Sequence, residues 1–419
     1  LVNRLLYLLM RRTDPLDLSR IVALTFTNKA ATEMKLRLRE RLRSLVNLEG
    51  RDNPPGGSGT VSVADLRMRY GWTTDEIVAR ADAALRDVEK AQIGTLHSFA
   101  AHLLRLYPIE AGVTPTFQTD EDGSRFEEHF TNEWELWLDR ELGATGSDHG
   151  RWRIVLDTFS LDELRELAYS LHSDLIDVNG LMQQVAETGL NQGLRDWFSI
   201  RKAQAERLLA RYDRPKRRKI ELMLAAVADL FTLLLAEGLG AVRSFSCESQ
   251  ELLAKDLGAA PTGWEDDDYE AVESLQRIAK RLLRVDHELL QNLLALLSPF
   301  VQSVRQSFLD SGWLTFDGLV GKARTLLRDH PPIREQLKRD YRALLVDEFQ
   351  DTDPVQYEIV LYLAERLGTQ AGSWRETELE SGKLFIVGDP KQSIYAFRRA
   401  DIEAFDHVVA RLEGSGALR

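Results

Sequence analysis

The sequence is poor in cysteine and has no long uninterrupted hydrophobic run. Its 419 residues include one cysteine, Cys247, which excludes a disulfide framework and any zinc or iron–sulfur site built on several cysteines. The longest apolar stretches, such as Leu222–Leu235 with its Asp229, are shorter than the roughly 18 uncharged residues of a membrane-spanning helix. We therefore expect no membrane association and a reducing, cytoplasmic setting.

The sequence also lacks an excess of basic side chains. It has 66 acidic and 54 basic residues, which gives a formal net charge of −12. This charge excludes a protein that wraps DNA through a uniformly cationic surface, but local clusters of cations and aromatic rings can still bind nucleic acid. The chain begins Leu-Val-Asn-Arg, without Met and without the features of a signal peptide, so we expect it to begin inside a larger protein.

Two stretches have the alternation of helical and strand patterns that is typical of an α/β fold. Helices are predicted at Leu1–Arg12, Lys29–Arg43, Thr74–Glu89, Ser98–Tyr107 and Pro354–Arg366. Continuous apolar runs are typical of buried parallel strands. On that basis strands are predicted at Ile21–Leu24, Ala91–Gly94, Ala343–Val346 and Leu384–Val387.

Between these stretches the pattern is mostly helical. Long amphipathic helical patterns cover, for example, Leu161–Leu171, Arg207–Leu235 and Ala271–Leu297. The segment Arg201–Lys219 carries nine basic and two acidic residues, and it could contact duplex DNA or form a solvated helix. The acidic run Glu265–Asp268 is interpreted as a solvated loop. We expect three sections: residues 1–120 and 341–419 are α/β, and residues 121–340 are a mostly helical insertion.

Two adjacent carboxylates, Asp347 and Glu348, directly follow the predicted strand Ala343–Val346. Ligands of parallel α/β sheets bind beyond the carboxyl ends of the strands. One carboxylate at such a position can hold Mg²⁺, and its neighbour can accept a proton from an attacking water. An apolar strand that ends in two acids is nevertheless common, so this pair alone indicates little more than the end of a strand.

A second group of polar and aromatic residues follows the strand Leu384–Val387. Gln392 could contact a γ-phosphate, and Tyr395, Phe397 and Arg398 could stack on the bases of single-stranded DNA. Taken alone, the two aromatic residues are more typical of a core, and the arginine of a solvated charge.

Small polar residues follow the two remaining predicted strands. Thr25, Phe26 and Asn28 come after the first strand, and Thr95 and His97 come after the second. Hydroxyl and amide groups at a strand-to-helix junction suit contacts with phosphate, and the start of a helix adds N–H donors. The same residues are ordinary helix caps, and a lone histidine there is more often structural.

Together and in this order, the four segments resemble the DNA helicases of the UvrD/Rep type in superfamily 1. The segments similar to motifs Ia, Ic, II and III of that family are Thr25–Ala31, Thr95–Phe99, Val346–Thr352 and Val387–Ala400. Phe316-Asp317 resembles a weaker motif. The segment Gly-Asp-Pro-Lys-Gln-Ser-Ile-Tyr-Ala-Phe-Arg, which begins at Gly388, is more similar to the RecB and AddA helicase–nuclease subunits than to stand-alone UvrD.

The resemblance implies a fold and a role for each matching residue. The fold would be an incomplete RecA-like P-loop NTPase domain with a parallel sheet, interrupted by the helical insertion. ATP and Mg²⁺ would be the cofactors: Asp347 would bind Mg²⁺, Glu348 would activate water, and Gln392 and Arg398 would contact the nucleotide. The residues implied to line the DNA track are Thr25, Phe26, Asn28, Thr95, His97, Tyr395, Phe397 and Arg398.

The implied activity is ATP-dependent 3′→5′ movement along one DNA strand, with unwinding of duplex DNA in recombinational repair. The implied partners are single-stranded and duplex DNA and a second subunit of a helicase–nuclease complex. An ATP-silent subunit that binds single-stranded DNA as a scaffold is an alternative. A third possibility, a P-loop NTPase that acts on something other than DNA, would leave Tyr395, Phe397 and Arg398 unexplained.

The sequence departs from the family pattern in three places. It contains no Gly-x-x-x-x-Gly-Lys-[Ser/Thr] loop to cradle phosphates, and we attribute this to truncation upstream of Leu1. The chain also ends about 20 residues after Arg398, without a second RecA-like domain. Arg399 stands where the family usually has Gly. We therefore expect that residues 1–419 alone bind ATP poorly and do not unwind DNA.

Overall fold

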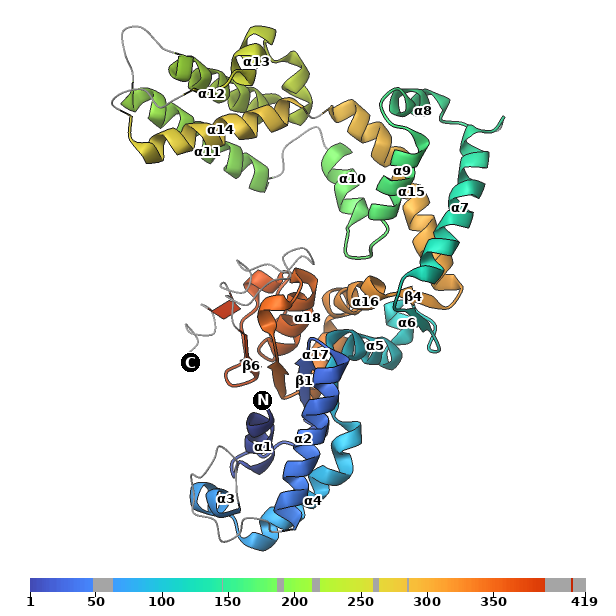
Figure 1. Ribbon diagram of the computed structural model, residues 1–419, viewed down its shortest axis with the longest axis vertical. Coiled ribbons are helices and arrows are strands. Elements are labelled where there is room, and N and C mark those ends of the chain that lie inside the picture. The colour runs from blue at the N-terminus through green and yellow to red at the C-terminus, as the bar shows by residue number, and fades with distance from the viewer. Residues whose placement is uncertain are drawn as a thin grey trace. The chain divides into compact units, whose positions relative to one another are not determined.

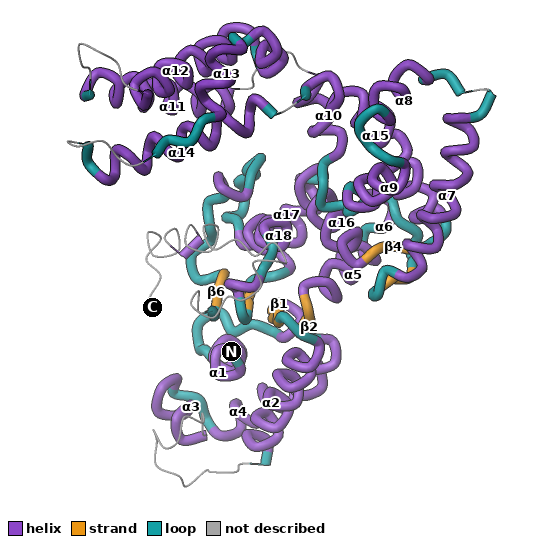
Figure 2. Tube along the Cα trace, turned by 45° about the horizontal axis from the view of Figure 1, so that its top comes forward, coloured by secondary structure: helices purple, strands orange, loops and turns teal. Residues whose placement is uncertain are grey.

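The computed structural model describes residues 1–47, 63–144, 146–186, 192–212, 219–258, 264–284, 286–388 and 408–409. The chain divides into two compact units (Figure 1). Unit 1 comprises residues 1–127, 173–175 and 307–419, and unit 2 comprises residues 128–172 and 176–306. All strands of the described residues belong to unit 1, as the colouring by secondary structure in Figure 2 shows.

The centre of unit 1 is a parallel sheet of four strands in the order β2-β1-β5-β6. The strands are β1 (Ile21–Thr25), β2 (Gln92–Thr95), β5 (Ala343–Val346) and β6 (Leu384–Ile386). Every residue of β1 and β5 is buried, which explains their continuous apolar sequences. The predicted strands and their parallel arrangement are therefore confirmed.

Helices cover both faces of this sheet, because successive side chains of a strand point to opposite sides. Ile21 and Ala23 of β1 pack in one core with α1 (Val2–Met10), α2 (Asn28–Val46) and α4 (Thr74–Asp87). Val22 and Leu24 pack in the other core. The helices on that second face are α5 (Leu96–Leu106), α16 (Phe316–Asp329), α17 (Pro331–Asp340) and α18 (Pro354–Ala364).

Unit 1 also contains elements that the sequence pattern did not predict. Two strands of three residues, β3 (Gln118–Asp120) and β4 (Trp313–Thr315), pair in parallel. Three residues are too few to display an alternation of apolar and polar side chains, so β4 was assigned to the helical stretch. The short helices α3 (Val63–Tyr70) and α6 (Pro108–Ala111) complete the unit.

Within the described residues, unit 2 is helical. Its helices are α7 (Ser124–Leu142), which begins in unit 1, α8 (His149–Leu156), α9 (Leu161–Ser170), α10 (Val178–Ala186), α11 (Gln192–Arg211), α12 (Lys219–Glu237), α13 (Cys247–Ala254), α14 (Asp266–Leu283) and α15 (His287–Asp310), which ends in unit 1. No helix among the described residues is both long enough and apolar enough to cross a membrane.

Two of the predicted helical stretches each include parts of two helices. Arg207–Leu235 includes parts of α11 and α12, and Ala271–Leu297 includes parts of α14 and α15. Amphipathic spacing reports which face of a helix is buried, and it does not by itself mark where one helix ends and the next begins. The start of α15 has a local signal, because Asp286 accepts a hydrogen bond from the Leu289 N–H at 3.0 Å.

The acidic run Glu265–Asp268 is not the solvated loop that the sequence suggested. Asp266 to Asp268 form the first turn of α14, where negative charge is favourable beside the helix dipole. Asp268 accepts a hydrogen bond from the Tyr212 hydroxyl at 2.7 Å and lies 2.9 Å from the Arg211 guanidinium. The run therefore joins α14 to the end of α11.

Candidate nucleotide and nucleic-acid sites

The polar residues predicted at strand ends lie at one edge of the sheet. Thr25 and Thr95 are directly paired at the ends of β1 and β2. Asp347 follows β5, and its N–H donates a hydrogen bond to the carbonyl oxygen of Leu24 at 2.9 Å. The parallel register therefore brings together segments that are about 320 residues apart in the chain.

Glu348 occupies a backbone conformation that favours glycine, with φ of 50° and ψ of 44°. Its carboxylate accepts a hydrogen bond from the Gln350 side-chain amide at 2.8 Å, and Gln350 is only 1% exposed. The loop is tied to the sheet, because the Phe349 N–H donates to the Val387 carbonyl oxygen at 3.0 Å. A strained residue that is so firmly held is a frequent feature of functional sites.

The Asp347 carboxyl group is partly buried, and its surroundings disfavour ionisation. Burial raises its pKa above the ordinary aspartate value, and the negative charge of Glu348 raises it further. Among the described residues no three acidic, histidine or cysteine side chains converge as a metal cage. Mg²⁺ in phosphate-binding sites is commonly held by one or two carboxylates together with water and phosphate oxygens, and Asp347 fits that mode.

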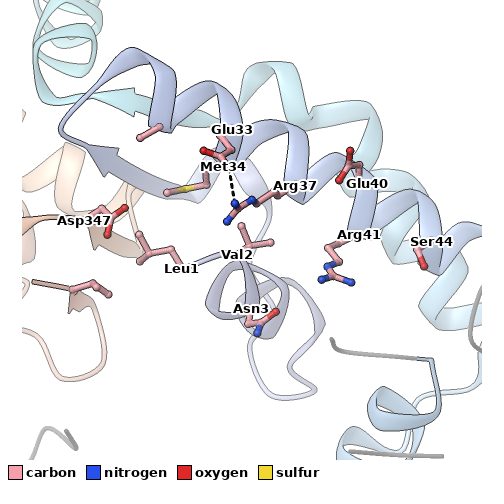
Figure 3. A pocket seen from close by; sticks show the side chains of 12 residues that line it. Leu1, Val2, Asn3, Glu33, Met34, Arg37, Glu40, Arg41, Ser44 and Asp347 are labelled. Carbon is pink, nitrogen blue, oxygen red and sulfur yellow. Dashed lines mark hydrogen bonds and ion pairs between the residues drawn. The ribbon is translucent and has the colours of Figure 1, made fainter. Parts of the chain in front are cut away.

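Asp347 lines a pocket of about 810 Å³ between the start of α1 and one side of α2, which we call the nucleotide pocket after the ligand proposed for it. Figure 3 shows Leu1, Val2 and Asn3 on one side of this pocket and the polar side chains of α2 on the other. The residues that line it are Leu1, Val2, Asn3, Ala30, Glu33, Met34, Arg37, Glu40, Arg41, Ser44, Asp347 and Val387. Arg37 and Glu33 form an ion pair at 2.5 Å, which leaves charges of both signs along this wall.

A second pocket, of about 880 Å³, opens beyond the ends of β1 and β2. Four of the predicted site residues line this polar–aromatic pocket: Phe26, Asn28, Thr95 and His97. Thr95 also caps α5 by accepting a hydrogen bond from the Ser98 N–H at 3.2 Å. The same residue therefore both caps the helix and lines the pocket. Thr25 lines neither pocket; it is buried, and its hydroxyl donates to the Thr27 carbonyl oxygen at 2.9 Å.

His97 stacks on Phe316, with the ring centres 3.6 Å apart and the planes 13° from parallel. Burial lowers the pKa of His97 to about 4, although the nearby Asp317 carboxylate acts in the opposite direction. The imidazole is therefore neutral at physiological pH, and with Phe316 it forms a flat apolar surface on one wall of the pocket.

Two segments, each running from the end of a strand into the first turn of the next α-helix, border both pockets. After β1, Phe26, Thr27 and Asn28 line the polar–aromatic pocket, and Ala30 lines the nucleotide pocket. After β5, Asp347 lines the nucleotide pocket, and Asp353 and Gln356 line the other. A displacement of either segment would therefore change both pockets.

Comparison with known proteins identifies the family. The model of the UvrD/REP helicase N-terminal domain matches residues 1–411. The chain belongs to this family. The helicase N-terminal domain is similar to an ATP-dependent helicase/nuclease subunit of Bacillus mycoides, at 24% identity over 99% of this chain and 35% of that protein.

Two further relatives are similar to the chain at a comparable identity and coverage. The corresponding ATP-dependent helicase/nuclease subunit of Bacillus cereus is 27% identical over 96% of this chain and 33% of its own length. The RecBCD enzyme subunit RecB of Escherichia coli is 24% identical over 95% of this chain and 32% of its own length. The chain therefore spans about a third of the length of these relatives.

Several predicted residues of the helicase domain lie outside the described residues. These are Gln392, Tyr395, Phe397 and Arg398, whose roles stay predictions. Sequence reasoning did not assign Leu175, Arg105, Glu121 or Gln356 to a site, although all four line the polar–aromatic pocket. They carry no local motif, and only the fold brings them to this place.

Proposed function

We propose that the chain is the N-terminal part of an ATP-dependent 3′→5′ DNA helicase that unwinds duplex DNA in recombinational repair. It would act as a RecB- or AddA-like subunit of a helicase–nuclease complex. The observation that carries this proposal is the segment from Phe26 to Ala30, which joins β1 to the first turn of α2 and lines both pockets. A motor must couple nucleotide turnover to DNA binding, and a shared segment is a direct physical route for that coupling.

The nucleotide pocket would hold the phosphates of ATP. Asp347 would bind Mg²⁺, which would neutralise phosphate charge, and Glu348 would accept a proton from the attacking water. Gln350 would keep the Glu348 carboxylate in its position through their hydrogen bond. The N-terminal end of α1 lines the pocket and offers N–H donors and a partial positive charge to an anion. Gln392 and Arg398 would contact the nucleotide.

The polar–aromatic pocket would hold single-stranded DNA. Phe26 and the His97–Phe316 pair would stack on bases, which is a contact that tolerates any sequence. Asn28 and Thr95 would donate hydrogen bonds to phosphates at the starts of α2 and α5. Thr25 would act indirectly, by fixing the loop after β1. Tyr395, Phe397 and Arg398 would extend the stacking surface.

The three sections predicted from the sequence would correspond to two structural parts. Residues 1–120 and 341–419 would be two parts of one RecA-like ATP-binding domain, and residues 121–340 would be an accessory insertion. The parallel sheet covered by helices on both faces supports this division. The exact boundaries stay a prediction.

Binding of a fluorescent oligo(dT) to the 419-residue chain tests the DNA side of this proposal. We expect Phe26→Ala to weaken binding about tenfold, since stacking on one base contributes about 1–3 kcal/mol. Phe385→Ala is a matched control, because Phe385 is a partly exposed aromatic residue that lines neither pocket. Equal affinities for the wild type and Phe26→Ala would contradict a DNA role for this pocket.

The ATP side is tested in the complete protein that carries this chain. Glu348→Gln removes the proton acceptor and keeps the shape of the side chain, so ATP turnover should fall at least a hundredfold while DNA binding persists. If ATP turnover is negligible in both the wild type and Glu348→Gln while both bind DNA normally, the ATP-silent scaffold is favoured. Turnover without any binding of DNA would favour an NTPase that acts on another substrate.

A further inference from the structure

A short segment from within the helical part of the chain belongs to unit 1. Residues 173–175 are assigned there, while residues 128–172 and 176–306 on either side belong to unit 2. Ser173 is only 4% exposed, and its hydroxyl donates a hydrogen bond to Asp317 at 2.6 Å. The same hydroxyl oxygen accepts a hydrogen bond from the Leu175 N–H at 3.3 Å, which fixes the turn of the segment.

Two glycines of α16 make room for this segment. A Cβ atom at Gly321 would lie 3.0 Å from the Cβ of Asp174 and 3.1 Å from its carbonyl oxygen. A Cβ atom at Gly318 would lie 2.8 Å from the Asp174 carboxylate. These distances are shorter than ordinary contacts. At Gly321 the neighbour is the backbone of Asp174, so a larger residue would press on the segment itself, whereas at Gly318 the Asp174 carboxylate could turn aside. Close backbone approach therefore explains the glycine at position 321.

The docked segment reaches the polar–aromatic pocket at two points. Leu175 lines the pocket itself and packs against the core of unit 1. Asp317, which Ser173 holds, directly follows Phe316, the ring that stacks on His97. The hydrogen bond from Ser173 thus fixes the first turn of α16 and, with it, the position of the stacked pair.

We propose that Ser173-Asp174-Leu175 forms part of the single-strand binding site, with Leu175 in contact with a nucleobase and Ser173 positioning the His97–Phe316 stack through Asp317. This inference rests on the proposed function of the pocket. A base is the expected occupant, because its apolar faces suit an isobutyl group beside an aromatic surface. Hydroxyl and amide groups on the same pocket suit the phosphates of the strand.

The positioning role is tested without DNA, by NMR of the 419-residue chain with ¹³C-labelled histidine. The His97 signal is assigned by its loss in His97→Gln. Ser173→Ala and Gly321→Ala should free the stack and expose the imidazole, and the measured pKa of His97 should rise from about 4 toward its ordinary value. Ser173→Ala is the conservative variant if Gly321→Ala disturbs folding.

Two matched controls accompany these variants. Ser311→Ala removes a hydroxyl that in the wild type donates a hydrogen bond to the Phe308 carbonyl oxygen, and Ser311 does not line the pocket. In Gly150→Ala the added Cβ meets no atom within 4 Å. Both controls should leave the His97 pKa unchanged. A His97 pKa that is equal in the wild type and in Ser173→Ala would overturn the positioning role.

The contact with a base is tested by binding of fluorescent oligo(dT). Leu175→Ala should weaken binding three- to tenfold and leave the His97 pKa near 4, whereas Ser173→Ala should change both quantities. Equal affinity of the wild type and Leu175→Ala would overturn the contact. If the wild type binds no oligonucleotide, the proposed function and the base contact both fail, and the NMR result alone decides the positioning role of Ser173.

Discussion

Glu348 combines a left-handed backbone with a buried hydrogen-bond partner. For a residue with a Cβ atom, this conformation costs about 1–2 kcal/mol, and the surrounding fold must compensate. The hydrogen bond from Gln350 and the ties between the loop and β6 supply that compensation locally. The arrangement indicates that the direction of the carboxylate takes precedence over stability at this position.

A pair of substitutions isolates the backbone strain. Glu348→Ala and Glu348→Gly both remove the carboxylate and its bond to Gln350, and they differ only in the Cβ atom. We expect Glu348→Gly to be more stable than Glu348→Ala by about 1 kcal/mol in urea unfolding, because glycine adopts positive φ without strain. A Glu348→Gly variant less stable than Glu348→Ala would mean that residue 348 carries less strain than the extra conformational entropy that glycine loses on folding.

His97 gives the molecule a specific dependence on pH. Its pKa is lowered to about 4 in the folded state, so between pH 6.5 and 4 the unfolded chain binds a proton that the folded chain does not. The folded state therefore loses stability as the pH falls through this window.

The effect of His97 on stability can be measured by comparing the wild type with His97→Gln. From pH 7 to pH 5 the free energy of unfolding of the wild type should fall by about 2 kcal/mol more than that of His97→Gln. Urea titrations at the two pH values give this difference, and contributions from other groups cancel. Parallel losses in the two proteins would show that His97 is not buried in solution.

At the level of elements, α17 and the end of α18 are joined by buried charges. Glu365 is fully buried, and its carboxylate lies 2.9 Å from Arg334 and 3.3 Å from Lys338. It also accepts a hydrogen bond from the Ala371 N–H at 2.7 Å. Desolvated ions of this kind are costly to separate, because the remaining partner keeps its charge in the interior.

Loss of one member of this network should destabilise unit 1. Glu365→Ala leaves buried Arg334 without a carboxylate and Lys338 with Glu335 alone, and we expect a loss of about 3–5 kcal/mol in the free energy of unfolding. Glu378→Ala is the matched control, because Glu378 pairs with Arg366 at the surface, where a pair contributes at most about 1 kcal/mol. Similar losses in both variants would contradict the distinction.

Strands were easier to predict than helix boundaries, for a physical reason. The runs at β1 and β5 are apolar at every position because both faces of the sheet are covered, and this leaves an unmistakable signal in the sequence. The amphipathic pattern does not mark where α11 ends and α12 begins. The pairing of Asp268 with Arg211 and Tyr212 depends on tertiary structure, so the sequence alone suggested a loop there.

At the scale of the whole molecule, the two units have separate hydrophobic cores. The cores of unit 1 lie on the two faces of the sheet, and a core around α12 lies within unit 2. Separate cores of this size are expected to unfold as separate cooperative transitions.

Calorimetry of two core variants tests this independence. Phe231→Ala in α12 removes a fully buried ring and should lower the midpoint of the unit 2 transition, at a cost of about 3–5 kcal/mol. Leu344→Ala in β5 should lower the midpoint of the unit 1 transition instead. A common shift of all transitions by either variant would show that the units unfold together.

The site could be predicted from the sequence only where it follows strands. Asp347 and Asn28, which line the two pockets, were singled out because a polar residue shortly after a buried strand is locally recognisable. Ser173 and Asp317 lie 144 positions apart, and neither belongs to a pattern that would pair them. Long-range contacts of this type depend on the packing of α16, which no local spacing reports.

The central claim is that one segment, Phe26 to Ala30 at the start of α2, couples nucleotide turnover to DNA binding. The most direct test is the rate of ATP hydrolysis by the complete protein with and without single-stranded DNA. We expect DNA to raise the rate at least tenfold in the wild type and to have little effect in Phe26→Ala, which retains Asp347 and Glu348. An equal stimulation in Phe26→Ala, or a rate that does not respond to DNA in the wild type, would contradict the account.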